Sequence, residues 1–204
     1  MTPTSLEEEL LLIVKKNKLE KLCRVRLQLF AVGGGLYGHE NNQPGFLIEC
    51  FPLDAESLPL NENGLVVGFA TGISKSMDSI SNLKSCNALI YAIAAQHAKE
   101  HKWNDALISN TSGNIIESTI ANIFWIKDET VYTPPLSDGC IAGVMRRYIL
   151  EKIPVLEKSL SANELFLADE VFLTNAVRRI KWLQQINDTF YKNEQVNRIY
   201  HSLF

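Results

Sequence analysis

Residues 105–133 read DALISNTSGNIIESTIANIFWIKDETVYT. Turn-forming pairs divide this stretch, Gly113-Asn114 near its start and Lys127-Asp128 near its end. Short runs rich in Ile, Val, Phe, Trp, Tyr and Thr between such pairs are typical of β-strands. The stretch therefore predicts four short strands, at Asp105–Ser109, Ile115–Glu117, Asn122–Ile126 and Thr130–Thr133.

Further strands and several helices are expected on both sides of this stretch. Residue alternation and short apolar runs predict strands at Cys23–Phe30, Phe46–Phe51, Leu65–Phe69 and Glu170–Leu173. Apolar residues at helical spacing predict helices over Leu6–Val14, Ser85–His101, Met145–Lys152, Ala162–Leu165 and Glu194–Leu203. By period alone Val177–Ile186 also fits a helix. Strands outnumber helices without strict βαβ alternation, so we expect an α+β fold with a largely antiparallel sheet.

Composition excludes several classes of protein. The chain has 204 residues and a net charge of −3, which argues against broad electrostatic binding to nucleic acid. It contains no apolar run of about 18 residues, as a membrane span would need. The four cysteines form no CxxC pair, and only His97 and His101 share a helix face. We therefore expect reduced thiols in the cytoplasm, surface histidines and no metal site.

Two basic positions could carry chemistry. Arg24 and Arg26 share one face of a predicted strand, and Gly33-Gly34-Gly35 follows it. They fit a solvated polar face, which is the commoner case, or a clamp for a carboxylate or phosphate. Lys84 stands where a polar loop meets an Ala-rich helix. It fits an exposed lysine, which this evidence alone favours, or a nucleophilic amine.

Two further features could hold a charged ligand. Glu117 is the only charged residue between Asn110 and Ile126, so it is either a turn glutamate or a carboxylate held against a cation. Ala142–Met145 opens a predicted helix and Thr174–Ala176 closes a strand. Each is either an ordinary cap or turn, or a source of backbone N–H groups for an anion.

Four spaced blocks of the chain, in order, resemble the class IV (branched-chain/D-amino-acid aminotransferase-like) family of pyridoxal phosphate enzymes. The blocks are Asn82–Asn87, Gly113–Phe124, Thr133–Arg146 and Ala168–Ala176, and upstream Arg24–Tyr37 resembles the strand and glycine loop that approach the substrate. The resemblance runs from about residue 10 to the end. It implies a D-amino-acid aminotransferase-like fold, mainly the C-terminal large domain, with a mixed sheet or pseudo-barrel and flanking helices. It also implies that Val177–Ile186 is a turn and strand.

The resemblance implies roles for nine residues. Lys84 is the catalytic lysine that carries pyridoxal phosphate as a Schiff base and moves the proton. Glu117 contacts the pyridine nitrogen. The phosphate is assigned to the backbone of Val144 and Met145, with Thr174 and Asn175 completing the cup. Substrate binding is assigned to Arg26, Arg24 and Ala176, and Arg26 is the best candidate for the substrate carboxylate.

Two departures from the family pattern matter. Met145 stands where the family usually has threonine, so a hydroxyl is lost. In addition, the resemblance implies that the family's small N-terminal domain, of roughly 70–80 residues, is largely missing from this sequence. We expect residues 1–20 to be its remnant and linker, and residues 21–204 to be the large domain. The chain is then a fragment of an ordinary enzyme, a natural short form that has lost catalysis, or one part completed by another polypeptide.

The leading functional expectation is a cytoplasmic, homodimeric aminotransferase that acts on an amino acid and a 2-oxo acid. The alternatives are 4-amino-4-deoxychorismate lyase, which eliminates pyruvate with the same lysine, and a non-catalytic family member. No nucleic acid or membrane partner is expected.

Overall fold

The computed structural model describes residues 3–33 and 44–204. The chain forms two compact units, Met1–Leu58 and Pro59–Phe204. Residues 21–58 thus group with the first unit, whereas the sequence prediction placed the boundary at residue 20. The division into a small-domain remnant and a large domain remains a prediction.

The first unit contains a helix and a two-stranded sheet. Helix α1 (Pro3–Lys16) precedes β1 (Cys23–Ala31) and β2 (Pro44–Pro52), and the short η1 (Ala55–Ser57) ends the unit. The two strands pair antiparallel from Cys23↔Pro52 to Ala31↔Pro44. This confirms both predicted strands. The predicted glycine loop falls mostly on residues 34–43, outside the described residues.

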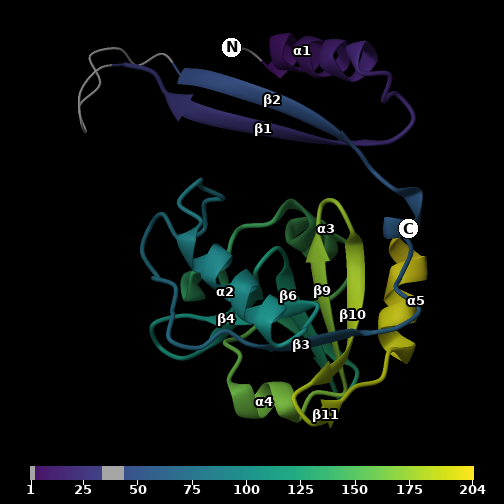
Figure 1. The fold of residues 1–204 in the computed structure, drawn as a ribbon. Helices are drawn as coiled ribbons and strands as arrows, with labels where there is room; N and C mark the ends of the chain where they lie inside the picture. Colours follow the sequence, from purple (N-terminus) through teal and green to yellow (C-terminus); the bar gives the residue numbers. More distant parts are fainter. Residues whose placement is uncertain (1–2, 34–43) are drawn as a thin grey trace. The chain divides into compact units, whose positions relative to one another are not determined.

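The second unit is built on a mixed sheet of nine strands (Figure 1). The strands are β3 (Leu65–Phe69), β4 (Asp105–Ser109), β5 (Ile115–Ser118), β6 (Asn122–Lys127), β7 (Thr130–Thr133), β8 (Leu156–Glu157), β9 (Glu170–Asn175), β10 (Arg179–Ile186) and β11 (Thr189–Phe190). Six of them close into a barrel in the order β10-β3-β4-β5-β6-β9, because β9 pairs with both β6 and β10. Six of the nine strand pairings in this unit are antiparallel, which confirms the predicted α+β class with a largely antiparallel sheet.

Helices cover two areas of the outer barrel surface (Figure 1). Helix α2 (Leu89–Glu100) packs its small residues onto β4. Helices α3 (Val144–Lys152) and α5 (Glu194–Leu203) cover Phe124 of β6 and Phe172 of β9, whose rings stack 4.9 Å apart. Burial of each such ring contributes about 1.5–3 kcal/mol. The short helices η2 (Leu136–Asp138) and α4 (Ala162–Phe166) complete the unit.

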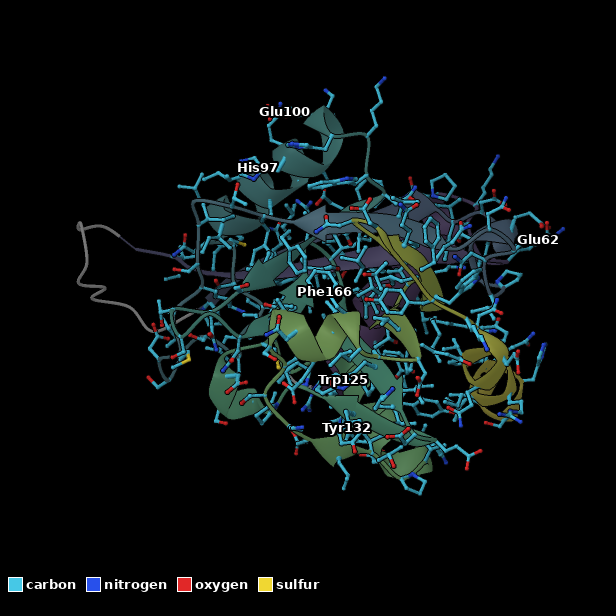
Figure 2. The ribbon with its side chains drawn as sticks, turned by 90° about the horizontal axis from the view of Figure 1, so that it is seen from below. Glu62, His97, Glu100, Trp125, Tyr132 and Phe166 are labelled. Carbon is cyan, nitrogen blue, oxygen red and sulfur yellow. The ribbon has the colours of Figure 1, made fainter. Side chains whose placement is uncertain are left out.

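The remaining apolar cluster includes residues of six neighbouring strands. Leu107, Ile123 and Leu173 belong to it, whereas their chain neighbours Ile108, Phe124 and Phe172 lie under the helices. Because side chains alternate along a strand, one set fills the barrel and the other faces outward. Figure 2 shows Trp125 and Tyr132 of this cluster, whose rings stack 5.3 Å apart.

Two segments differ from the periodicity-based expectation. Residues Arg179–Ile186 form strand β10, as the family resemblance implied, and do not form the helix that the periodicity allowed. Its hydrogen bonds to β3 and β9 decide the outcome, and sequence period does not contain that information. Helix α2 begins at Leu89 and not at Ser85, because the preceding residues form turns such as Ser85 N to Leu83 O.

Candidate functional site

A row of three buried polar side chains crosses the outer face of the barrel. Glu117, Asn122 and Thr174 lie opposite one another on β5, β6 and β9. They are exposed by only 2%, 6% and 1%. Directly opposite residues in a sheet project to the same side. The row therefore separates the surface under α2 from the surface under α3 and α5, and it brings together two of the sequence-predicted blocks.

Three hydrogen-bond donors contact the Glu117 carboxylate. Its Oε1 accepts from Lys75 Nζ at 2.6 Å and from the Tyr91 hydroxyl at 2.7 Å. Its Oε2 accepts from the Ile141 N–H at 2.8 Å. The sequence left two interpretations of Glu117 open, a turn glutamate or a carboxylate held against a cation. In the structure the carboxylate is held against the Lys75 cation.

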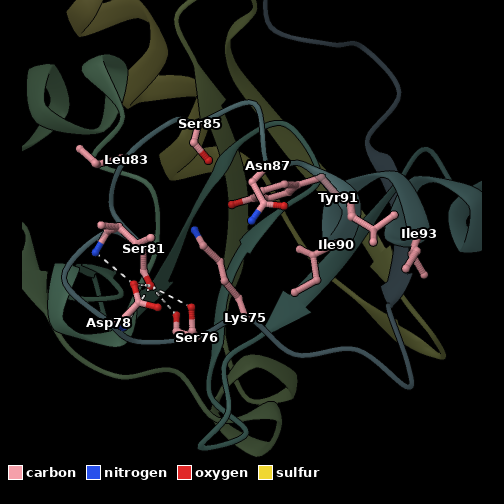
Figure 3. A pocket seen from close by; sticks show the side chains of 12 residues that line it. Lys75, Ser76, Asp78, Ser81, Leu83, Ser85, Asn87, Ile90, Tyr91 and Ile93 are labelled. Atoms are coloured by element: carbon pink, nitrogen blue, oxygen red, sulfur yellow. Dashed lines mark hydrogen bonds between the residues drawn. The ribbon is translucent and has the colours of Figure 1, made fainter. Parts of the chain in front are cut away.

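A pocket of about 360 Å³ opens beside this ion pair. Lys75 extends into it toward Asn87 and Tyr91 (Figure 3). Apolar side chains form much of the remaining wall, among them Ile80, Leu83, Leu89, Ile90 and Ile93. A pocket with apolar walls and a few convergent polar groups is typical of a small-molecule site.

Lys84 lies at the edge of this site, in the loop before α2. It is exposed, while its neighbours Leu83 and Ser85 line the pocket. The loop is anchored two residues earlier by Asn82. The Asn82 side-chain amide donates to two backbone carbonyls, Leu136 O at 2.8 Å and Cys140 O at 2.6 Å. The backbone carbonyl of Asn82 accepts from the Ala142 N–H. The block that holds Lys84 is thus attached to the segment that leads into α3.

The N-terminus of α3 also belongs to this neighbourhood. Gly143 is the extended residue before the helix, and the first intrahelical bond runs from Arg147 N–H to the Gly143 carbonyl. The N–H groups of Val144 and Met145 therefore precede that bond, at the positive end of the helix dipole. Val144 is 66% exposed, whereas Met145 is partly buried against the outer core. Asn122 donates to the Ile141 carbonyl at 2.8 Å and thereby ties this turn to the polar row.

Thr174 and Asn175 already have partners. The Thr174 hydroxyl donates to the Arg179 carbonyl at 2.9 Å. The Asn175 Oδ1 accepts from the N–H groups of Val177 and Arg178, so Asn175 caps the turn between β9 and β10. Ala176 is exposed in this turn. Thr174 and Asn175 also line a second, smaller pocket of about 100 Å³.

Arg24 and Arg26 belong to the first unit. The Arg26 guanidinium pairs with Glu49 at 2.7 Å and donates to Gln28 at 2.8 Å. The Arg24 guanidinium lies 4.8 Å from the centre of the Phe51 ring. Glu49 is directly opposite Arg26 in the β1–β2 pair, so the strand register supplies this partner.

Burial keeps two groups near Glu117 protonated. It raises the pKa of the Tyr91 hydroxyl, and the Glu117 carboxylate raises it further. Tyr91 therefore remains a donor at neutral pH. Burial likewise raises the pKa of the Cys140 thiol to about 11, although the positive charge of Arg146 opposes this shift.

Lys75 and Tyr91 are site residues that sequence reasoning missed. Lys75 lies in the polar stretch before Lys84, and Tyr91 lies within the helix predicted over Ser85–His101. The available signal was a lone lysine shortly after the apolar run Leu65–Phe69. Its partner Glu117 is 42 residues away in the chain, and only the fold brings them together.

Two kinds of feature are absent from residues 3–33 and 44–204. No helix in these ranges is long and apolar enough to cross a membrane. Across the same ranges, no group of three or more His, Cys, Asp or Glu side chains is placed to hold a metal ion.

The barrel with its flanking helices is the fold of class IV aminotransferases. The chain superposes on the branched-chain amino acid aminotransferase of Escherichia coli with a TM-score of 0.86. That comparison covers 98% of this chain and 70% of the other, at 24% identity. The family model described as Amino-transferase class IV matches residues 1–185, so the chain belongs to that family.

The curated relatives carry two different functional names. An aminodeoxychorismate lyase from Vibrio harveyi is 31% identical over 139 residues, which are 66% of this chain and 51% of the relative. A branched-chain-amino-acid aminotransferase from Salmonella typhimurium is 26% identical over 190 residues, 86% of this chain and 60% of the relative. The chain thus spans between half and three fifths of the length of these relatives.

Proposed function

We propose that the chain is part of a pyridoxal phosphate-dependent aminotransferase that moves an amino group between an amino acid and a 2-oxo acid. The single observation that carries this proposal is the buried Glu117 carboxylate, placed between a lysine-bearing loop and the N-terminus of α3. A carboxylate, an amine and an anion-binding helix end are the three groups that this cofactor needs from a protein.

The residues present fit the cofactor. Glu117 is 2% exposed and already pairs with a cationic nitrogen, that of Lys75. The same carboxylate can hold a protonated ring nitrogen. When bound, pyridoxal phosphate supplies an electron sink for carbanion chemistry.

Lys84 is the residue that we propose to hold the cofactor covalently and to carry a proton during the reaction. Its exposure leaves the amine accessible, and the hydrogen bonds of Asn82 fix the loop against the segment before α3. A short, anchored loop limits how far the amine can move from the site, and this positioning accounts for much of catalytic efficiency.

The phosphate is assigned to the N–H groups of Val144 and Met145. Exposure of Val144 and the helix dipole both favour an anion there. Thr174 and Asn175 would complete the cup. Because the Thr174 hydroxyl donates to the Arg179 carbonyl, it would have to turn away from that carbonyl in order to donate to a phosphate.

The substrate assignments follow the family resemblance. Arg26 is proposed to bind the substrate carboxylate, with Arg24 and Ala176 as secondary contacts. Since Arg26 pairs with Glu49, substrate would have to compete with that carboxylate. A homodimer in the cytoplasm is proposed on the same basis.

A second candidate function is 4-amino-4-deoxychorismate lyase, because a relative with that name is 31% identical to this chain. Turnover that depends on 2-oxoglutarate supports the aminotransferase and excludes the lyase. Release of pyruvate and 4-aminobenzoate from aminodeoxychorismate supports the lyase instead.

Both assays should include Lys84→Ala and, as a matched control, Lys99→Ala on the exposed side of α2. We expect Lys84→Ala to abolish turnover and Lys99→Ala to retain it. Absence of both activities and of cofactor binding in the unmodified chain would mean that this chain by itself is not a working enzyme, and would leave a non-catalytic family member or a part that another polypeptide completes.

A further inference from the structure

We infer that Lys75 and Tyr91 are positioning residues that hold one oxygen of the Glu117 carboxylate beside a positive charge and leave one acceptor site on the other oxygen for the cofactor's ring nitrogen. This inference rests on the proposed function. It adds two residues, neither of them a ligand of the cofactor, that determine how the site recognises a basic ring.

The hydrogen bonds of Glu117 define the acceptor site that remains. An ionised carboxylate has about four lone-pair sites, two on each oxygen. Lys75 and Tyr91 take the two on Oε1, at 2.6 and 2.7 Å. The Ile141 N–H takes one on Oε2, at 2.8 Å. With these three described donors in place, Oε2 is the oxygen that can accept a further hydrogen bond.

Oε2 is also the oxygen on the side of the proposed phosphate site. Ile141 lies two residues before Gly143, the residue from which α3 begins. A ligand with a basic ring nitrogen at one end and a phosphate near the other could therefore reach Oε2 and the start of α3 together.

Lys75 is held in place independently of its ammonium group. Its N–H donates to the Ser109 carbonyl at 2.9 Å, and its carbonyl accepts from Thr111 N–H at 3.0 Å. The residue is 8% exposed, and its Nζ lies 5.4 Å from the centre of the Tyr91 ring. Backbone bonds and packing therefore fix the cation close to the carboxylate.

The charge of Lys75 has a chemical consequence for Glu117. A buried carboxylate without a cationic neighbour tends to take up a proton. A neutral carboxyl group would attract a protonated ring nitrogen only weakly. Tyr91 adds a neutral donor that remains protonated, because burial and the carboxylate both raise its pKa.

The test compares two ligands of nearly equal shape on the full chain. One is pyridoxal 5'-phosphate and the other is its 1-deaza analogue, in which carbon replaces the ring nitrogen. The ratio of their dissociation constants reports the contact between the ring nitrogen and Glu117. General destabilisation weakens both ligands alike and leaves this ratio unchanged.

In the unmodified chain we expect the nitrogen-containing ligand to bind about 10- to 150-fold more tightly, the range of a charge-assisted hydrogen bond. Glu117→Gln should reduce this preference to near unity. Lys75→Met should reduce it by roughly tenfold or more, whereas Lys75→Arg, which keeps the charge, should retain most of it. Tyr91→Phe should give an intermediate loss.

Two results would overturn the inference while leaving the proposed function intact. One is a full preference in Lys75→Met. The other is tighter binding of pyridoxal phosphate by Lys75→Met, which would mean that Lys75 competes with the ring nitrogen. Failure of the unmodified chain to bind either ligand would contradict the proposed function itself, and the inference with it. If Lys75→Met does not fold, the same comparison between Lys75→Arg and Tyr91→Phe decides, since equal full preference in both would contradict a positioning role.

Discussion

Helix α5 is capped by a carboxylate from a distant strand, and this contact allows a quantitative prediction. Glu170 of β9 accepts hydrogen bonds from the N–H groups of Gln195 and Val196, at 2.8 and 2.7 Å. Asn193, the residue before the helix, makes no side-chain capping bond of its own. Glu170 is 5% exposed, so water cannot replace it easily. The perturbation is Glu170→Gln, which keeps the shape and removes the charge.

The expected cost follows from the two bonds. Each hydrogen bond to a charged group contributes about 1.5–3 kcal/mol. Glutamine retains one acceptor oxygen and turns a donor toward the second N–H, so one bond is lost. Loss of the favourable charge at the helix N-terminus adds about 0.3–1 kcal/mol. We therefore expect Glu170→Gln to lower the free energy of unfolding by about 2–4 kcal/mol.

Urea denaturation at neutral pH measures this cost. The matched control is Glu194→Gln, which removes the same charge from the first turn of α5 at an exposed position. It should cost no more than about 1 kcal/mol. Amide hydrogen exchange should also become faster along α5 in Glu170→Gln. Equal stabilities of the two variants would show that the buried Glu170 carboxylate does not stabilise this helix by capping it.

Three further predictions test other parts of the structure. Asn82→Ala removes two hydrogen bonds to loop carbonyls, so the loop before α2 loses its anchor. We expect pyridoxal phosphate binding to weaken by about tenfold or more, and equal affinity in a binding titration would contradict this. With a pKa of about 11, only about one part in a thousand of the Cys140 thiol is ionised at pH 8. Iodoacetamide should therefore label the exposed Cys86 first and Cys140 only after the protein unfolds. Early labelling of Cys140 in the native protein would contradict its burial. The N–H of Asp128 and then the Lys127 ammonium lower the pKa of Asp169, so its contribution to stability is present at neutral pH and is lost as the pH falls through that lowered pKa. Asp169→Asn should accordingly cost about 1 kcal/mol or less at pH 7 and nothing in strong acid, and a cost that persists in acid would exclude this cause.

The strands could be predicted from the sequence because their signals are local. Leu65–Phe69, Asp105–Ser109 and Thr130–Thr133 have the predicted bounds, since turn residues delimit each run. The two-residue strands β8 and β11 were missed, because so short a pairing leaves no periodic pattern. For β10, helical period and strand pairing disagreed, and pairing with two neighbours decided the outcome.

The candidate site was only partly predictable, since its contacts join distant parts of the chain. Glu117 stood out as a lone charge in a neutral run, and the structure places it against Lys75. Lys75 itself gave no comparable signal, because a lysine in a polar loop is ordinary. The contact of Asn82 with the segment before α3 spans more than 50 residues and depends on the barrel. The roles of Lys84, Val144 and the other assigned residues remain predictions.

Chemical mapping tests directly whether Lys84 is the residue that holds the cofactor. The full chain is incubated with pyridoxal phosphate, treated with sodium borohydride to make any lysine–cofactor bond permanent, digested and analysed by mass spectrometry. Lys84→Ala removes the lysine under test, and Lys99→Ala removes another exposed lysine as the matched control. We expect a dominant modification on Lys84 that persists in Lys99→Ala and disappears in Lys84→Ala. A dominant modification on Lys75, or labelling spread evenly over surface lysines, would contradict this assignment.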